Sequence, residues 1–183
     1  MPDLMNILPS FSFFFSARMR STVCDGIPQT WSLDSNQAIH TLVAKAPIYA
    51  MQWRPMPSTS SSASSEMEAS RSAGPRILAT ASFDYIVRLW NADTGDLIHT
   101  LAFHTANVHS LGFSRDGRLL ASGSFDYQLG IWDVQEGALL KSYQGGGGIF
   151  EVGWNADNTR LAACFSNNKV GGIAVLHHRL ADD

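Results

Sequence analysis

The chain has 183 residues, of which 45% are hydrophobic and 16% charged, a composition that can bury one core and excludes a chain disordered as a whole. Thirteen Lys+Arg against sixteen Asp+Glu give a net charge of -3, and the basic residues are scattered singly, which argues against a direct nucleic-acid ligand. The two cysteines, Cys24 and Cys164, are too few for a disulfide framework or a zinc site. We therefore expect an intracellular protein without a metal or cofactor.

Residues 1–20 are left unassigned as a leader. Their apolar run from Phe11 to Phe15 is too short to span a bilayer, and Asp3 stands where a signal peptide would be positively charged. We expect neither export nor a membrane segment. The stretch is interpreted as a non-core leader or the unusual start of a truncated product.

Residues 21–57 contain the first repeat-like segments. Trp31 follows Asp25 by six residues, and the strand-like sequence IYAMQW ends at Trp53. Residues 58–75 are rich in serine, a composition typical of a solvated linker loop inserted into a folded domain. A docking segment controlled by phosphorylation is the alternative for this loop.

A repeat of about 42 residues follows the serine-rich loop. Residues 78–90, LATASFDYIVRLW, align without a gap on residues 120–132, LASGSFDYQLGIW, so that Trp90 corresponds to Trp132. Each copy is flanked by short alternating segments and by turn signals such as Asp-Thr-Gly and Arg-Asp-Gly. The repeating unit is therefore predicted to be a four-stranded antiparallel sheet.

A second series of aromatic landmarks runs in register with the first. Strand-like segments end at Trp53, Phe113 and Trp154, but the first interval is 60 residues and the second is 41. One insertion, the serine-rich loop at 58–75, accounts for the excess.

A period of 40 to 45 residues with four strands and a Trp-Asp pair marks a β-propeller blade. The predicted fold is all-β, an incomplete WD-repeat β-propeller of about three to four blades from a larger ring, with blades over residues 76–176 and a tail at 177–183. Because propellers close with roughly four to eight blades, we expect a fragment or truncated product, whose ring closes only with missing blades or by self-association.

One repeat contains a histidine, a hydroxyl and a carboxylate, namely His104, Ser124 and Asp126. Nucleophilic catalysis is one interpretation, but no Gly-x-Ser-x-Gly turn or oxyanion loop accompanies the serine. The motifs resemble the WD-repeat family, in which such residues and a tryptophan form a structural hydrogen-bonded tetrad. The resemblance implies a tetrad of His104, Ser124, Asp126 and Trp132, and an incomplete one in the preceding blade, where Ala44 replaces the histidine beside Ser82, Asp84 and Trp90. No catalytic residue is predicted.

Partner binding is predicted at the rim formed by loops, because propeller blades act as rigid supports. The turns between the second and third strands repeat Phe-Asp-Tyr, and the second position of each first strand is also aromatic or histidine. Exposed aromatic rings at fixed positions suit a binding site. The alternative is that these rings pack between blades. The candidate partner-binding residues are Phe83, Tyr85, Phe125, Tyr127, Tyr49, His109 and Phe150.

A closer resemblance is carried by LATASFDYIVRLW, LIHTL, LLASGSFDYQLGIWD and GGIFEVGWN. Together these look like the C-terminal repeats of the transducin-β-like, F-box-like WD-repeat proteins. That resemblance implies a nuclear adaptor of corepressor complexes that contain histone deacetylase and recruit the ubiquitin–proteasome system, although the family's N-terminal LisH and F-box-like regions are absent. The alternatives are another WD-repeat scaffold, such as a ubiquitin-ligase substrate receptor or a G-protein-β-like platform, and a serine hydrolase.

Overall fold

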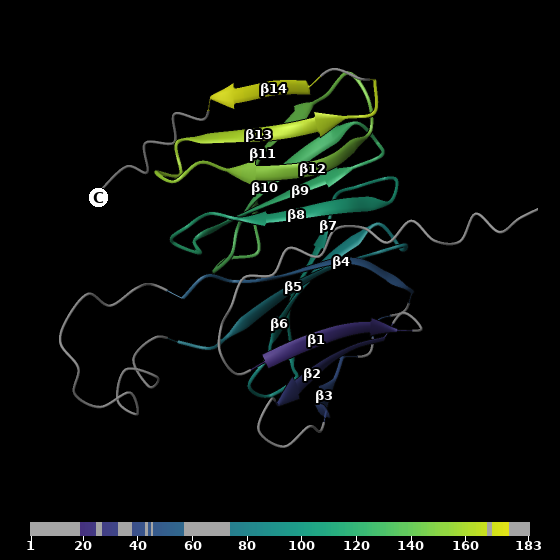
Figure 1. Cartoon of the computed structure of the whole chain (residues 1–183), viewed down its shortest axis with the longest axis vertical. Helices are drawn as coiled ribbons and strands as arrows, with labels where there is room; N and C mark the ends of the chain where they lie inside the picture. The colour runs from purple at the N-terminus through teal and green to yellow at the C-terminus, as the bar shows by residue number, and fades with distance from the viewer. Residues whose placement is uncertain are drawn as a thin grey trace, which may run out of the picture.

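The computed structural model describes residues 19–24, 27–32, 38–42, 44, 46–56, 74–167 and 170–175. These residues form β-strands arranged in four antiparallel sheets (Figure 1). Two sheets have four strands each: β4 (Ile48–Trp53), β5 (Ile77–Ser82), β6 (Ile86–Asn91) and β7 (Leu97–Ala102), then β8 (Val108–Phe113), β9 (Leu119–Ser124), β10 (Gln128–Asp133) and β11 (Leu139–Gln144). The other two have three: β1 (Met19–Cys24), β2 (Ile27–Ser32) and β3 (Ala38–Thr41), then β12 (Ile149–Trp154), β13 (Arg160–Phe165) and β14 (Val170–Val175). The predicted all-β architecture of propeller blades is confirmed.

Each complete sheet follows the chain order, so neighbouring strands are joined by short connections or, between β4 and β5, by the longer serine-rich segment. Strands β5 and β9 are buried along their whole length, whereas β11 at the sheet edge is largely exposed. The second strand is therefore the most buried strand of each four-stranded sheet, and it lies between two neighbouring strands. The connections between third and fourth strands turn at Gly95 and Gly137, whose positive φ angles favour glycine.

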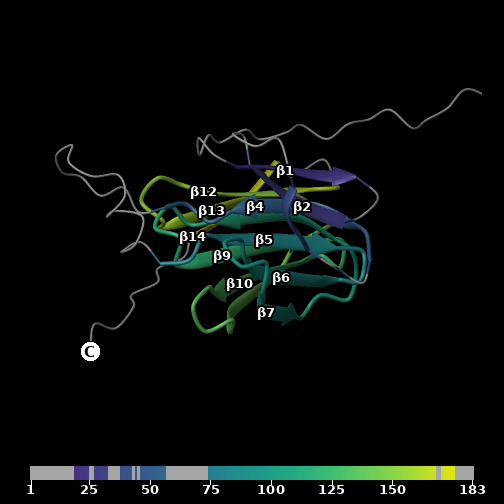
Figure 2. The same ribbon diagram turned by 90° about the horizontal axis from the view of Figure 1, so that it is seen from below.

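The four sheets are stacked along the long axis of the molecule, in chain order (Figure 1). Strands β4, β8 and β12 form successive contacts between sheets, and Figure 2 shows β4 and β12 along one side with β7 along the opposite side. One hydrophobic core lies between the sheets β4–β7 and β8–β11, and another lies between β8–β11 and β12–β14. The cores are therefore located between blades, as a propeller requires.

Larger side chains of one sheet pack against glycine residues of the preceding sheet. A Cβ atom on Gly123 would lie 2.5 Å from Ile149, and one on Gly112 would lie 3.3 Å from Val152. Two hydrogen bonds join the same sheets, since Val152 N–H donates to Ser110 Oγ at 2.8 Å and Trp154 Nε1–H donates to Gly112 O at 2.9 Å. The corresponding Gly153 on β12 has nothing within 4 Å of its Cβ position. Among the described residues, that face of β12 is uncovered at Gly153.

Several sequence-based assignments fall at the limits of the described residues. Strand β1 begins at Met19, inside the segment 1–20 that the sequence leaves unassigned as a leader. Nearly all of the serine-rich loop and the whole tail at 177–183 lie outside the described residues. No helix in the described part of the chain is long and apolar enough to cross a membrane.

The glycine run from Gly145 to Gly148 is packed closely against side chains of neighbouring segments. A Cβ atom on Gly145 would lie 2.2 Å from the Phe165 ring, and one on Gly148 would lie 2.4 Å from the Phe125 ring. Gly148 N–H also donates to Ser166 Oγ at 3.0 Å. Glycine is needed here because the backbone passes directly against aromatic rings.

Candidate functional site

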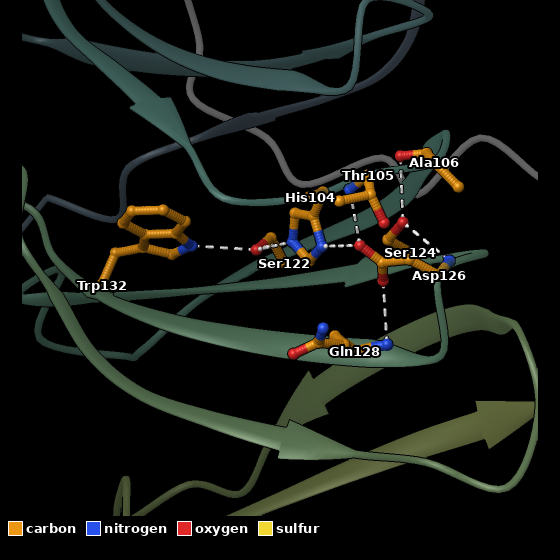
Figure 3. Close-up of polar contacts among 8 residues, drawn as sticks. All are labelled: His104, Thr105, Ala106, Ser122, Ser124, Asp126, Gln128 and Trp132. Atoms are coloured by element: carbon orange, nitrogen blue, oxygen red, sulfur yellow. Dashed lines mark hydrogen bonds and ion pairs between the residues drawn. The ribbon is translucent and has the colours of Figure 1, made fainter.

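The sheet β8–β11 contains a continuous chain of hydrogen bonds from its third strand to the loop before its first strand (Figure 3). Trp132 Nε1–H donates to Ser122 Oγ at 2.9 Å, and Ser122 Oγ lies 2.8 Å from His104 Nε2. His104 Nδ1 in turn lies 3.0 Å from Asp126 Oδ2. These four side chains connect strands β9 and β10 to the loop that precedes β8.

The predicted participation of Ser124 is wrong, because Ser122 is the hydroxyl in the network. Both serines lie on the same face of β9, two residues apart. Ser122 is paired with Gly130 across the ladder, which brings it within reach of the indole of Trp132. Ser124 lies two residues further along the strand and donates to Ala106 O at 3.0 Å.

The hydrogen-bond order in this network favours a neutral imidazole. If Ser122 Oγ–H donates to His104 Nε2, then Nδ1–H donates to Asp126, and each polar atom has a partner. A protonated ring would instead leave the serine hydrogen without an acceptor in a buried position. Burial lowers the pKa of His104 below its ordinary value, although the Asp126 carboxylate acts in the opposite direction.

The order serine, histidine, carboxylate has the connectivity of a nucleophilic triad. Ser122 is fully buried, however, and its oxygen also accepts the indole N–H of Trp132. A nucleophile must reach the carbonyl carbon that it attacks, and this hydroxyl faces the interior between strands. The network therefore has the geometry of a structural element that holds the strands and the preceding loop together.

The Asp126 carboxylate also fixes the neighbouring backbone. It accepts hydrogen bonds from Thr105 N–H at 2.8 Å and from Gln128 N–H at 2.9 Å. The second of these closes the turn Phe125–Asp126–Tyr127, in which Tyr127 has a φ of 69°. Asp126 thus positions the two aromatic residues that flank it.

The sheet β4–β7 achieves the same result with different residues. Trp90 Nε1–H donates to Thr80 Oγ1 at 2.8 Å, so threonine takes the place of serine. Arg88 donates to both carboxylate oxygens of Asp84, at 2.6 and 3.1 Å, and to Ser82 Oγ at 3.1 Å. Ser82 also donates to Asp84. The tetrad predicted to be incomplete is therefore replaced by two separate groups, the Trp90–Thr80 pair and the cluster of Arg88, Ser82 and Asp84.

The hydrogen bonds of Arg88 and Ser82 have an electrostatic consequence for Asp84. Burial alone would raise the pKa of this carboxyl, but the hydrogen bonds from Arg88, Ser82 and the Ile86 N–H outweigh that effect and lower the pKa. Asp84 is therefore ionised over the whole neutral range, with its charge compensated by Arg88. In the sheet β8–β11, by contrast, Asp126 is bonded to a neutral ring.

Five of the candidate partner-binding residues form one continuous row of rings, which we call the aromatic row: Phe83, Tyr49, His109, Phe125 and Phe150. Successive ring centroids lie 5.9, 4.1, 4.1 and 5.1 Å apart, mostly in edge-to-face contact. The row crosses three sheets, since its members come from β4, β8, β12 and the two Phe-Asp-Tyr turns.

The aromatic row packs on itself and still faces solvent. Tyr49, Phe83 and Phe150 are 41%, 44% and 50% exposed. The rings contact each other between blades and also keep exposed faces, and partner binding by them stays a prediction. His109 lies in the middle of the row, and burial lowers the pKa of its ring.

Tyr85 and Tyr127 stand apart from the aromatic row. Each is exposed, at 43% and 49%, and each has a positive φ, 70° and 69°. A left-handed backbone is costly for a tyrosine, by roughly 1–2 kcal/mol, so both turns retain an aromatic ring at a strained position. In the part of the chain that the structure describes, neither tyrosine has a ring contact within this fold.

Sequence reasoning missed three residues of the two networks, Thr80, Arg88 and Ser122, and it did not single out Gly130 at the position equivalent to Arg88. A usable signal exists for the hydroxyls, because Thr80 and Ser122 each precede their tryptophan by ten residues. Arg88 and Gly130 occupy equivalent positions in the two repeats. The repeat with Arg88 has Ala44, and the repeat with Gly130 has His104. Among the described residues, no three His, Cys, Asp or Glu side chains gather where they could hold a metal ion.

Comparison with known proteins agrees with this geometry. Residues 95–133 match the family model of the WD domain, G-beta repeat. The chain is 56% identical over 103 residues to the F-box-like/WD repeat-containing protein TBL1X of Mus musculus, and 58% identical over 94 residues to TBL1Y of Homo sapiens. It is 55% identical over 93 residues to the WD40 repeat-containing protein HOS15 of Arabidopsis thaliana.

These alignments cover 56%, 51% and 51% of the chain, but only 19%, 18% and 15% of the three relatives. The chain thus spans less than a fifth of the length of the curated relatives that it matches. Within that span, the resemblance to WD-repeat proteins of the F-box-like type is confirmed.

Proposed function

We propose that this chain, which carries a WD repeat and is similar to F-box-like/WD repeat-containing proteins, is a protein-binding scaffold whose partner lies on the aromatic row. The observation that supports this is the continuous contact of five rings, three of which are exposed, across three sheets. Aromatic side chains bury large areas at low cost in side-chain entropy, and for this reason they are enriched at the energetic centres of interfaces.

The two networks beneath the row prepare it for binding. Asp84 and Asp126 close the turns that carry Phe83 and Phe125, and both carboxylates are fixed by two or more hydrogen bonds. A partner would therefore meet rings that are already held in place. Preorganisation of this kind increases affinity because less conformational freedom is lost on association.

The finer proposal is an adaptor of nuclear corepressor complexes that contain histone deacetylase and recruit the ubiquitin–proteasome system. It rests on the similarity to the F-box-like/WD repeat-containing relatives and extends to partners and location. In this proposal the chain contributes binding surface and no chemistry, in keeping with the buried position of Ser122.

The test is a pull-down from nuclear extract with the whole chain as bait. A Tyr49→Ala/Phe150→Ala variant removes two exposed rings of the row, and Leu140→Ala, 39% exposed on β11, is the matched control. Wild type and control should retain histone deacetylase or corepressor subunits, and purified subunits should bind directly. The double variant should lose both.

Two results would contradict the proposal in different ways. Undiminished capture by the double variant would place the partner elsewhere on the molecule. Recovery of ubiquitin-ligase subunits or G-protein effectors in place of corepressor subunits would favour another WD-repeat scaffold. Labelling of Ser122 or Ser124 by an active-site organophosphonate would instead support the serine hydrolase alternative.

A further inference from the structure

The two complete sheets differ at a pair of linked positions. The sheet β8–β11 combines His104 with Gly130, whereas the sheet β4–β7 has Ala44 and Arg88 at the equivalent positions. We propose that Arg88 replaces the missing histidine as the residue that positions Asp84, and that the pairs Ala44/Arg88 and His104/Gly130 are exchangeable solutions for fixing the Phe-Asp-Tyr turn. The proposal does not depend on which partner the aromatic row binds.

The contacts of Arg88 are those that a positioning role requires. Its guanidinium binds both oxygens of Asp84 and the hydroxyl of Ser82, and it is buried although it is charged. Bidentate pairs between arginine and a carboxylate are strong and fix the orientation of both groups. Asp84 then accepts Ile86 N–H at 3.2 Å, which closes the turn that contains Phe83 and Tyr85.

The ladder explains why arginine can act from this position. Arg88 is paired with Thr80, the hydroxyl that binds the indole of Trp90. Gly130 is likewise paired with Ser122, the hydroxyl that binds Trp132. In both sheets the position lies opposite the hydroxyl, on the third strand. A side chain of arginine length starting there reaches the carboxylate at the end of the sheet.

The same geometry explains why His104 is accompanied by glycine. A Cβ atom on Gly130 would lie 3.0 Å from Ser122 Oγ and 3.0 Å from Trp132 Nε1. Contacts that short require the network to shift, and the histidine already occupies the space beside Ser122. Each sheet therefore uses either a histidine from the preceding loop or an arginine from the third strand.

The two solutions differ in their response to acid. Arginine remains charged at any pH at which the protein is folded, so the pair of Arg88 and Asp84 does not titrate near neutrality. The network of His104 depends on a neutral ring, and Asp126 is the one charged group hydrogen-bonded to that ring among the described residues. The turn at Phe125–Tyr127 should therefore loosen in mild acid, while the turn at Phe83–Tyr85 should not.

The experiment is amide hydrogen exchange of the two turns in the whole chain, at about pH 7.5 and about pH 5.5, on either side of the ordinary histidine pKa and corrected for intrinsic rates. Arg88→Gly should lower protection of the turn at Phe83–Tyr85 by about tenfold or more, because charge-assisted hydrogen bonds are lost. Arg76→Gly is the matched control, since it breaks an arginine–aspartate pair that is exposed and should change the protection of that turn less than twofold, as roughly expected for surface pairs.

The decisive variant is Ala44→His/Arg88→Gly. It should restore most of the protection lost in Arg88→Gly, and it should make the turn at Phe83–Tyr85 sensitive to acid. The reciprocal pair, His104→Ala and His104→Ala/Gly130→Arg, tests the same exchange in the other sheet. There the double variant should regain protection at the turn Phe125–Tyr127 and lose its dependence on pH.

Two outcomes would overturn the proposal. Arg88→Gly could leave the turn as protected as Arg76→Gly does, which would show that Arg88 does not position Asp84. Alternatively, both double variants could be no better protected than their single parents, which would show that arginine and histidine are not exchangeable. If Arg88→Gly fails to fold, the reciprocal pair alone decides between these results.

Discussion

Replacing Ser122 by alanine should destabilise the protein more than any other loss of a single hydroxyl on β9. Ser122 Oγ is the shared partner of Trp132 Nε1–H and His104 Nε2, and all three side chains are buried. A buried polar group left without a partner costs about 1–3 kcal/mol. Since the two groups belong to one network and their costs are not additive, we expect a loss of about 2–4 kcal/mol.

Ser124→Ala is the matched control, because Ser124 is equally buried on the same face of the same strand. Its hydroxyl binds Ala106 O and Asp126 N–H. Both residues are half-buried, so water can replace the lost partner. We therefore expect a cost of about 1 kcal/mol for this variant.

The assay is urea unfolding followed by circular dichroism, with thermal melting as a second measure. A loss of about 3 kcal/mol corresponds to a Tm lower by roughly 6–12 °C for a chain of this size. The indole N–H resonance of Trp132, assigned with Trp132→Phe, should shift in Ser122→Ala and stay in place in Ser124→Ala. An equal or larger cost for Ser124→Ala would refute the assignment of Ser122 to the network.

Three further predictions follow from the packing and the titrating groups. Gly123→Ala should push Ile149 away from β9 and lower the free energy of unfolding by about 1–3 kcal/mol. Gly153→Ala, with open space around it, should leave the free energy of unfolding within about 0.5 kcal/mol of wild type. Similar melting of both variants would contradict the described contact between sheets. Tyr127→Asn should raise the free energy of unfolding by about 1 kcal/mol, because asparagine tolerates the positive φ better; a destabilised variant would show that the ring is needed for the fold. Burial lowers the pKa of both His104 and His109, so the unfolded chain binds protons more tightly. Stability should therefore be full above about pH 6.5 and fall as the pH drops through that value. Urea titrations between about pH 7 and pH 5 should show a smaller pH dependence in His104→Gln, and an unchanged one would exclude His104 as a cause.

The identity of the repeat could be predicted because it depends on local pattern. Alternation of apolar residues, turn glycines and a fixed interval between Trp90 and Trp132 are properties of the chain itself, and the sheets have the predicted strands at those places. The strand at Val170–Val175 appears even though its residues depart from the repeat. The sequence also indicates that the rings around His109 share one face, since equivalent positions in successive blades must lie side by side.

The sequence by itself determined the unit, its period and the positions of the turns, since strands and turns form from neighbouring residues. Which hydroxyl meets Trp132, and what fixes Asp84 where a histidine is missing, was decided by tertiary structure. The first depends on register across the ladder, where a shift of two residues would exchange Ser122 for Ser124. The second depends on the length of a side chain that starts opposite Thr80. Distances of this kind join residues from different strands, and for that reason the role of Arg88 becomes visible only in the folded sheet.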